Sequence, residues 1–353
     1  MEGYTTTVHR SVAELKQGEW NAIVAQQSKA GSVFERYEWL AAYEAASDAR
    51  PGYVEVRKHG TLVGVHPTFT RPVGGTPFSF LGPAQPGYNG PLVATDEAEV
   101  LGAMLDAIEN RCGGRTIGHM FKPAAGRSLR YANALRDRGY VPTVRGCQFR
   151  VALDRPWEAI AAGLHHDKRR NLNRADDAGV VVEQVHPTAE AIAEFAAMHE
   201  RQMARIGGEG TTHAFLDALR ERLADRITLF VARVDGENAG ELLTVSDDER
   251  DRLYLLFPGY DPDGFEFYAS EALYRAAMQW GIEQGYSECN FGETEPDWTD
   301  GTFAYKSKFG AEVVPSLRWE RIHSRLLRIP YFLAGGSTVG PGFGGRIREF
   351  LRR

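Results

Sequence analysis

Two lysines, Lys306 and Lys308, lie in the short segment "AYKSKFG" between two runs that read as core strands. When an amine attacks an ester or thioester, negative charge develops on the carbonyl oxygen, and a positioned cation stabilises that charge. A lysine on a tight turn between two strands is held firmly enough for this role, and Lys306 and Lys308 are the two candidates. The alternative for both lysines is an ordinary charged surface.

The run before this segment ends in "NFGE", which puts Asn290, Gly292 and Glu293 at the carboxyl end of a strand. Folds of the α/β class place ligands at such strand ends. An attacking ammonium group must first lose a proton, and the carboxylate of Glu293 can accept it. The alternative is a strand that ends in a polar turn.

The segment "HDKRRNLNRA", residues 166–175, is expected to begin a helix. Its Lys168, Arg169 and Arg170 combine cationic side chains with free backbone N–H groups, and this combination favours an anion such as a substrate phosphate. The alternative is a solvated basic turn whose charges pair with the aspartates that follow.

The elements that must position these residues follow from hydrophobic periodicity and from helix stop signals. We predict helices near 157–178, 188–206, 213–224 and 270–284, a hairpin at 229–245, strands at 180–185, 252–260 and 288–292, a short turn at 302–309, and a final strand. Ser270 is predicted to cap the helix at 270–284, and Gly285 is predicted to end it.

The first half of the chain repeats the design of the second half. Each half contains a hairpin of two alternating strands, at 53–67 and at 229–245. Glycines recur in the same order and at nearly constant spacing: Gly60 and Gly236, Gly113 and Gly285, Gly139 and Gly310. A repeat this long indicates two duplicated α/β domains, because the repeats of solenoids span only about 20–50 residues.

The composition describes an ordinary globular protein, with 43% hydrophobic and 25% charged residues. A net charge of −6 gives no general reason to expect nucleic acid as a partner. The three cysteines, Cys112, Cys147 and Cys289, are odd in number and far apart, so we expect a reducing, cytoplasmic location without disulfides. No signal peptide and no membrane-spanning run is expected.

The order of elements, antiparallel strands that lead into a strand–helix–strand crossover, resembles that of the GNAT acetyltransferases. Two such copies are similar to the Fem family (FemAB/FemX-like) of tandem-GNAT transferases and to BioF-like GNAT domain proteins, over roughly residues 10–322. The resemblance implies an α/β (α+β) fold of two tandem GNAT-like domains, each a mixed, mostly antiparallel sheet flanked by helices. The expected domains are residues 1–150 and 151–323, followed by a basic, glycine-containing tail at 324–353.

Three short segments carry the resemblance at residue level. Arg169, followed by Asn171, matches a Fem-type pattern whose arginine contacts a substrate phosphate. The segment at 305–310 matches an aromatic-Lys-x-x-Phe-Gly segment whose lysine lies against the acyl carbonyl. Around Trp39, "SVFERYEWLAAY" resembles the Fem-type entry segment, but Tyr43 stands where the muramyl-peptide-binding members carry a lysine. A nucleotide-linked muramyl peptide is therefore not expected as the acceptor.

The resulting candidate site has two parts. The expected catalytic residues are Lys306, Glu293 and Tyr305. The expected substrate-binding residues are Arg169, Lys168, Asn171, Asn290, Gly292, Trp39 and Phe309. No metal site is expected, because no Cys or His cluster has ligand spacing and the adjacent His165 and His166 cannot share one helical face.

The resemblance implies an acyltransferase that moves an acyl or aminoacyl group directly from an activated donor to an amine, or less favourably a hydroxyl, of a cell-envelope or metabolite acceptor. The donor is an aminoacyl-tRNA, as in Fem-type members, or an acyl-CoA, as in BioF-like relatives, and no tightly bound cofactor is expected. The junction "FPGYDPDGFEFYASEAL" lacks the pyrophosphate-binding pattern of CoA-dependent GNAT proteins, and the acidic net charge disfavours tRNA. The alternative is a catalytically inactive tandem-GNAT binding module.

The tail at 324–353 contains six arginines and a single acidic residue, Glu349. Its apolar residues lie beside these arginines, a combination that favours contact with an anionic membrane surface and hence a lipid-linked acceptor. The alternative is a tail that packs on the domain or is disordered.

Overall fold

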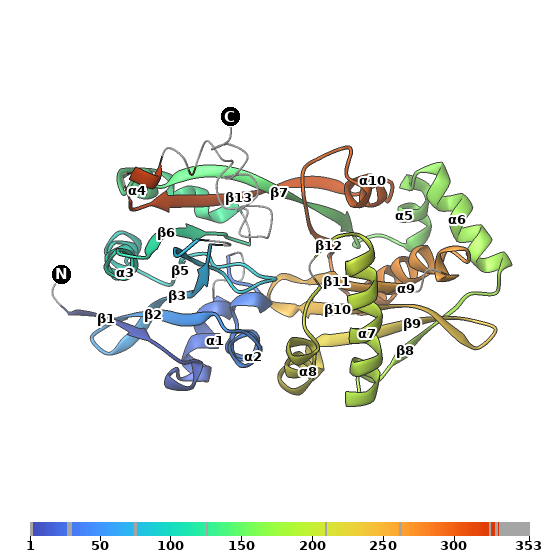
Figure 1. The fold of residues 1–353 in the computed structure, drawn as a ribbon, viewed down its shortest axis with the longest axis horizontal. Helices are drawn as coiled ribbons and strands as arrows, with labels where there is room; N and C mark the ends of the chain where they lie inside the picture. Colours follow the sequence, from blue (N-terminus) through green and yellow to red (C-terminus); the bar gives the residue numbers. More distant parts are fainter. Residues whose placement is uncertain are drawn as a thin grey trace. The chain divides into compact units, whose positions relative to one another are not determined.

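The computed structural model describes residues 3–26, 30–73, 76–124, 126–208, 210–260, 263–324, 326–328 and 331. The chain divides into two compact units: unit 1 contains Met1–Arg145 and Leu317–Arg353, and unit 2 contains Gly146–Ser316. Figure 1 shows their helices and strands. Most of the tail expected at 324–353 lies outside the described residues, so its membrane contact stays a prediction.

Unit 1 is built around a mostly antiparallel sheet in the order β1-β2-β3-β4-β6-β13. Its strands are β1 (Tyr4–His9), β2 (Arg50–Lys58), β3 (Thr61–Pro72), β4 (Ser79–Gly82), β5 (Leu92–Val93, paired with β3), β6 (Thr116–Phe121) and the end of β13 (Glu312–Ile322). Its helices are α1 (Gln17–Gln26), α2 (Tyr37–Ala46), α3 (Glu97–Arg111) and α4 (Ala132–Asp137).

In unit 2 the strands follow the order β7-β12-β11-β10-β9-β8. Its strands are β7 (Val141–Ala152, from Gly146 on), β8 (Val181–Val185), β9 (Ile227–Val234), β10 (Glu237–Asp247), β11 (Arg252–Tyr260) and β12 (Glu288–Thr294). Its helices are α5 (Trp157–Gly163), α6 (His166–Asp177), α7 (Ala189–Arg205), α8 (His213–Arg222), α9 (Ala269–Glu283) and α10 (Gly301–Ser307).

The two units share one plan, which confirms the duplicated, mixed and mostly antiparallel fold. Each has one parallel strand pair joined through a helix, β4–α3–β6 in unit 1 and β11–α9–β12 in unit 2. The helix of each crossover packs apolar residues on its own sheet. Met104 of α3 lies in one core cluster with Val54, and Leu273 of α9 lies in another with Leu253. Both predicted hairpins are present, and their turns need the left-handed backbone of Gly60 (φ 85°) and Gly236 (φ 86°).

The last strand of each half pairs with the sheet of the other half. β7 follows β6 in the chain but pairs with β12, and β13 follows β12 but pairs with β6. The chain therefore passes between the units inside β7, after Arg145, and inside β13, after Ser316. In this respect the units differ from the continuous domains expected from the sequence.

Three local predictions need correction. The helix expected near 157–178 is two helices, α5 and α6, because Leu164 and His165 adopt extended backbone between them. The turn expected at 302–309 is the short helix α10. Ser270 lies inside α9, whose N-cap is Tyr268 in a left-handed conformation (φ 57°).

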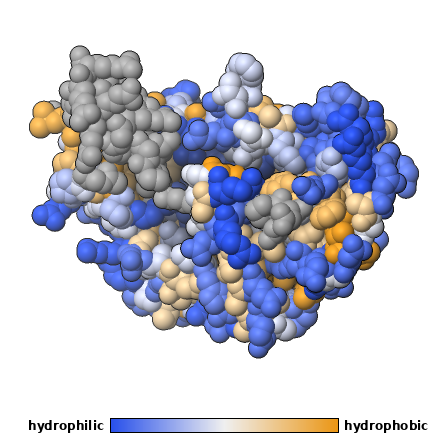
Figure 2. Space-filling model, turned by 45° about the vertical axis from the view of Figure 1, so that its right-hand side comes forward, coloured by the Kyte–Doolittle hydropathy of each residue, from blue (hydrophilic) through white to orange (hydrophobic). Residues whose placement is uncertain are grey.

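Hydrophilic side chains predominate on the face drawn in Figure 2, with smaller apolar areas between them. This agrees with the high proportion of charged residues in the sequence. Throughout the described part of the chain, no helix has both the length and the apolar character needed to cross a bilayer.

A chain of buried hydrogen bonds crosses the core of unit 1. His66 and His119 are fully buried, and their Nε2 atoms are 3.1 Å apart. Because the carbonyl of Gly90 can only accept, His66 Nδ1 donates to it, His119 Nε2 donates to His66, and the hydroxyl of Tyr140 donates to His119 Nδ1 at 2.9 Å. Burial lowers the pKa of His66 to about 3 and holds the pKa of His119 well below its ordinary value, so both rings stay neutral.

This pair predicts acid-sensitive stability. As the pH falls from about 7.5 to about 5.5, the unfolded chain gains protons at both histidines while the folded chain does not, so the free energy of unfolding should fall by up to about 1.4 kcal/mol per pH unit for each ring. Denaturant titrations at several pH values measure this slope. His119→Gln should reduce the slope, whereas the exposed His186→Gln should leave it unchanged; equal slopes in the two variants would contradict the assignment.

Candidate active site

Lys306 lies on α10, the short helix that follows β12. Asp300 caps this helix, since its side chain accepts a hydrogen bond from the Phe303 amide at 2.9 Å. The Lys306 side chain is buried, with 8% of the residue exposed, and its Nζ donates to Thr294 Oγ1 at 2.7 Å. The sequence therefore places an ammonium group inside the protein beside a hydroxyl group at the end of β12.

Burial dominates the electrostatics of this lysine. It lowers the pKa of Lys306 to about 8, although the neighbouring Cys147, Asp300 and Glu293 act in the opposite direction and favour the protonated form. Near neutral pH most of the ammonium group remains charged, because its pKa still lies above 7. A charged group held away from water is well placed to stabilise a developing oxyanion.

Glu293 reaches the same region through an irregularity in β12. The pairing register of β12 with β7 shifts between Asn290 and Glu293, and Gly292 between them has a left-handed backbone (φ 75°). Asn290 fixes this bulge: its Oδ1 accepts from the Gly292 amide at 2.9 Å, and its Nδ2 donates to Gln148 Oε1 at 2.8 Å. Bulges commonly redirect a side chain next to an active site.

The carboxylate of Glu293 lies against the backbone of β7 at Gly146. A Cβ atom at Gly146 would be 2.5 Å from Glu293 Oε1, so any other residue there would displace the carboxylate. The neighbouring Cys147 is buried, and its thiol donates to the carbonyl of Thr294 at 3.6 Å. Burial raises the pKa of this thiol, which keeps it neutral.

A second buried cluster lies around Glu271 in the first turn of α9. Lys168 Nζ of α6 pairs with Glu271 Oε1 at 2.7 Å, and Asn171 donates to the same oxygen at 3.0 Å. Ser270 donates to the other oxygen at 2.6 Å. Burial alone would raise the pKa of Glu271, but the charge of Lys168 and these hydrogen bonds hold the pKa below its ordinary value.

The ammonium group of Lys168 also contacts two aromatic rings next to Lys306. Its Nζ lies 3.4 Å from the centre of the Tyr305 ring and 4.6 Å from that of Phe309. Phe309 is buried among Tyr274, Phe291 and Tyr305. The ion pair of α6 and α9 thus supports the residues on either side of Lys306.

The end of this segment is fixed against the end of α5. Gly310 has a left-handed backbone (φ 67°), and a Cβ atom there would lie 2.5 Å from the carbonyl oxygen of Gly163. The amide of His165 donates to the carbonyl of Lys308 at 2.9 Å. Only glycine satisfies both the conformation and the close approach, which explains the glycine that ends the "AYKSKFG" segment.

The predicted site residues fall into two groups and two separate residues, Arg169 and Trp39. Lys306, Glu293, Asn290 and Gly292 lie around the end of β12, and Lys168, Asn171, Tyr305 and Phe309 lie around Glu271. Arg169 is exposed and donates to the carbonyl oxygens of Leu164 (2.6 Å) and Ala162 (3.2 Å) at the end of α5. Trp39 is fully buried in unit 1, where its indole N–H donates to the carbonyl of Pro86.

The structure adds residues that the sequence analysis did not select: Glu271, Thr294 and Gly146. An acidic residue in a first helical turn is common, and a threonine or glycine in a strand carries no signal of its own. Their contribution depends on partners that lie far away in the chain, such as Lys168 for Glu271.

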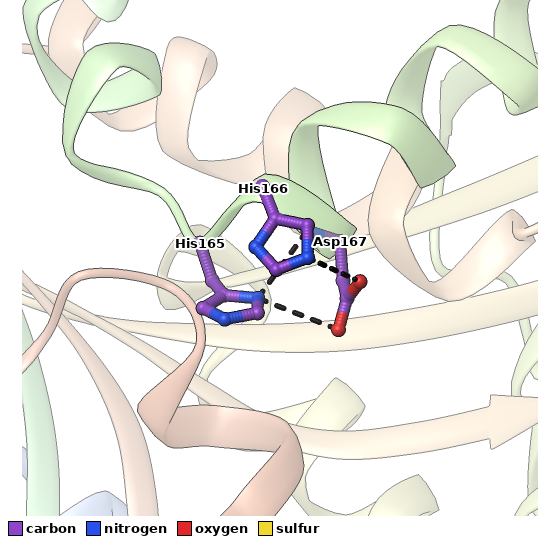
Figure 3. A group of neighbouring side chains, drawn as sticks. All are labelled: His165, His166 and Asp167. Carbon is purple, nitrogen blue, oxygen red and sulfur yellow. Dashed lines mark hydrogen bonds and ion pairs between the residues drawn. The ribbon is translucent and has the colours of Figure 1, made fainter.

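His165, His166 and Asp167 gather at the start of α6, where both rings lie beside the carboxylate (Figure 3). The two histidines do not share a helical face, as expected, but their ring centres still lie 4.1 Å apart, because His165 is the N-cap and lies outside the helix. Lys308 Nζ lies 2.9 Å from one oxygen of Asp167, and an Arg170 nitrogen lies 3.2 Å from the other. These cations already balance the carboxylate, so we assign the cluster to linking α6 with the end of α10.

Comparison with known proteins agrees with this geometry. Residues 163–307, which include Lys168, Glu271, Glu293 and Lys306, match the family described as "Acetyltransferase (GNAT) domain". No curated protein sequence matches the chain.

Among solved structures, FemX is similar with a TM-score of 0.71 and 13% identity, covering 92% of this chain and 99% of FemX. L-PGS from Bacillus licheniformis is similar with a TM-score of 0.58 and 15% identity, covering 96% and 97% of the two chains. A tandem GNAT protein from the clavulanic acid biosynthesis pathway gives a TM-score of 0.57 and 12% identity, covering 91% and 99%. The chain has a Fem-like tandem GNAT fold.

The start of α9 indicates whether unit 2 can bind the pyrophosphate of CoA in the usual GNAT position. CoA-dependent GNAT proteins bind the pyrophosphate in the turn before this helix, and the sequence lacks their pattern. Here the first turn of α9 is buried, with Ala269 at 1% and Ser270 and Glu271 at 4% exposure, and it already contains the carboxylate of Glu271. A pyrophosphate at the same helix start would have to enter a buried turn whose carboxylate is already paired with Lys168.

We expect Lys306 to titrate well below other lysines. In protein labelled with ¹³C at lysine Cε, one resonance should titrate near pH 8 instead of the ordinary 10.5, and it should vanish in Lys306→Arg. Glu293→Gln should lower this pKa further, because a negative charge that favours the ammonium form is removed. If the resonance lost in Lys306→Arg titrates near 10.5, the lysine is not buried as described.

We also expect the Lys168–Glu271 pair to be essential for stability. Lys168→Met leaves a buried carboxylate without its cation and should lower the free energy of unfolding by about 3–5 kcal/mol. The double variant Lys168→Met/Glu271→Met should recover most of this loss. The matched control is Lys308→Met, which removes a more exposed pair and should cost less than about 1 kcal/mol. Equal losses from the two single variants in denaturant titrations would refute the role.

Proposed function

We propose that this protein is an acyltransferase that moves an acyl or aminoacyl group from an activated ester or thioester directly to an amine. The observation that carries the proposal is the buried ammonium group of Lys306, which has the hydroxyl of Thr294 as its hydrogen-bond partner and whose protonated form the charge of Glu293 favours. The GNAT match over residues 163–307 supports the same reaction class.

The proposed roles follow from charge. Glu293 accepts a proton from the ammonium form of the acceptor, and the free amine attacks the carbonyl carbon of the donor. Lys306 stabilises the oxyanion that forms. The carbon–oxygen or carbon–sulfur bond then breaks, the new amide nitrogen loses its extra proton, and the leaving oxygen or sulfur takes up a proton. Tyr305 and Phe309 hold Lys306 in place through their contacts with Lys168.

The start of α9 bears on the choice of donor. Its first turn is buried and occupied by the Lys168–Glu271 pair, which disfavours the usual CoA pyrophosphate position in unit 2. An aminoacyl ester does not need that position, and the similarity in fold to FemX and L-PGS is consistent with this donor. We therefore place aminoacyl-tRNA before acyl-CoA, with a lipid-linked or metabolite amine as the acceptor.

Mass spectrometry of the protein incubated with cell extract and either aminoacyl-tRNAs or acyl-CoAs tests the proposal. We expect loss of one donor class and a mass-shifted acceptor. Lys306→Met should lower the rate of transfer by a factor of about 10²–10³. Lys308→Met, which changes the lysine just after α10, should keep the rate of the parent protein. A ligand-dependent rise in melting temperature without donor loss in either arm would instead identify a binding module without catalytic activity.

A further inference from the structure

The loop that joins β12 to α10, residues 295–300, presents an exposed tryptophan (Figure 1). Trp298 lies in this loop, and 81% of the residue is exposed. Tryptophan is usually well buried, because its ring offers the largest apolar surface of any side chain. The other tryptophans of the chain are all buried or half-buried: Trp20, Trp39, Trp157, Trp280 and Trp319. Only the indole of Trp298 is left in contact with solvent.

The loop connects the two groups that hold Lys306. It follows Thr294, whose hydroxyl accepts the hydrogen bond of the Lys306 ammonium group. It ends at Asp300, which caps the short helix that carries Lys306. Both ends of the loop therefore belong to the candidate active site, and the exposed indole lies between them in the chain.

Hydrogen bonds fix the turn that carries Trp298. Asp297 Oδ1 accepts from the Thr299 amide at 2.9 Å and from the Thr299 hydroxyl at 2.7 Å. The Asp300 amide donates to the carbonyl of Asp297 at 3.0 Å, which closes a β-turn with Trp298 at its first corner. The backbone of the turn is thus held without packing of the indole, so replacing the indole should leave the loop in place.

The loop is acidic. It contains Glu295, Asp297 and Asp300, and residues 290–305 include no lysine, arginine or histidine. Within the described part of the chain, no basic side chain forms an ion pair with any of these three carboxylates. Negative charge around an exposed indole favours a cation, because the face of the ring also attracts cations. The same charge disfavours the phosphates of a tRNA.

We infer that Trp298 and this acidic loop bind the acceptor, and that the acceptor is a cationic amine. The inference rests on the proposed function, from which it takes an amine as the acceptor. The ammonium form of the acceptor binds over the indole face and is attracted by the carboxylates of the loop. Glu293, which directly precedes Thr294 at the end of β12, then takes the proton, and the neutral amine attacks the donor.

Indole N–H spectra of the full chain, labelled with ¹⁵N at tryptophan, test this binding without turnover. Trp298→Leu assigns the resonance of Trp298. In titrations with butylammonium chloride, with the ionic strength kept constant by sodium chloride, we expect a saturable shift of this resonance, and n-butanol at the same concentrations should cause none. Glu295→Gln should weaken the binding about twofold, whereas the exposed Glu190→Gln in α7 should leave it unchanged. An equal shift with n-butanol, or no shift with butylammonium, would overturn the inference.

Steady-state kinetics with the acceptor identified by mass spectrometry separates this inference from the proposed function. Trp298→Leu should raise the KM for the acceptor about two- to fivefold, as expected for loss of an exposed cation–π contact, and should change kcat and the KM for the donor less. Trp298→Tyr, which keeps an aromatic face, should lie closer to the parent protein. A raised KM for the donor with an unchanged KM for the acceptor would overturn the inference and leave the acyltransferase in place. Absence of transfer in the parent protein would overturn the proposed function, while the butylammonium titration would still decide whether the loop binds a cationic amine.

Discussion

The candidate site of unit 2 depends on one buried ion pair, Lys168 with Glu271. The pair joins α6 to the first turn of α9, and the same ammonium group contacts the rings of Tyr305 and Phe309 on both sides of Lys306. A helix of seven residues such as α10 has little stability of its own. Its position therefore comes from these contacts, and the position of Lys306 comes with it.

Close backbone approaches impose the second constraint on the site. Gly310 passes the carbonyl of Gly163, Gly146 leaves room for the carboxylate of Glu293, and Gly292 allows the bulge that redirects β12. Gly310 and Gly146 avoid a steric conflict where two elements meet, and Gly292 supplies a left-handed backbone. The charged groups can come together only because the backbone beside them has no side chain.

Much of the fold could be predicted from the sequence, because its signals are local. The left-handed turns at Gly60 and Gly236 and the crossover helix before Gly285 follow from turn chemistry and periodicity, and their order in two halves indicated the duplication. The pairing of β7 with β12 and of β13 with β6 could not be predicted, since pairing between strands that lie far apart in the chain leaves no local pattern. The break between α5 and α6 was also missed, because Leu164 and His165 are compatible with a helix.

The candidate site was predictable only in part. Lys306 was found from its residue type and its resemblance to the Fem-type segment, and Glu293 from its residue type at the end of a strand; the structure places Lys306 in the interior. Glu271 was missed because its importance depends on Lys168, which is distant in the chain. For Lys168 itself, the sequence suggested an exposed anion-binding group, whereas the structure shows a buried partner of Glu271.

The central claim is that Lys306 acts as a cation during transfer, and the pH dependence of kcat tests it most directly. With the donor and acceptor identified, kcat should fall as the pH rises through about 8, where Lys306 loses its proton. Lys306→Arg should be slower but should lose this decline, because arginine keeps its charge. A decline near pH 8 that persists unchanged in Lys306→Arg, or a kcat that rises as the lysine becomes neutral, would contradict the account.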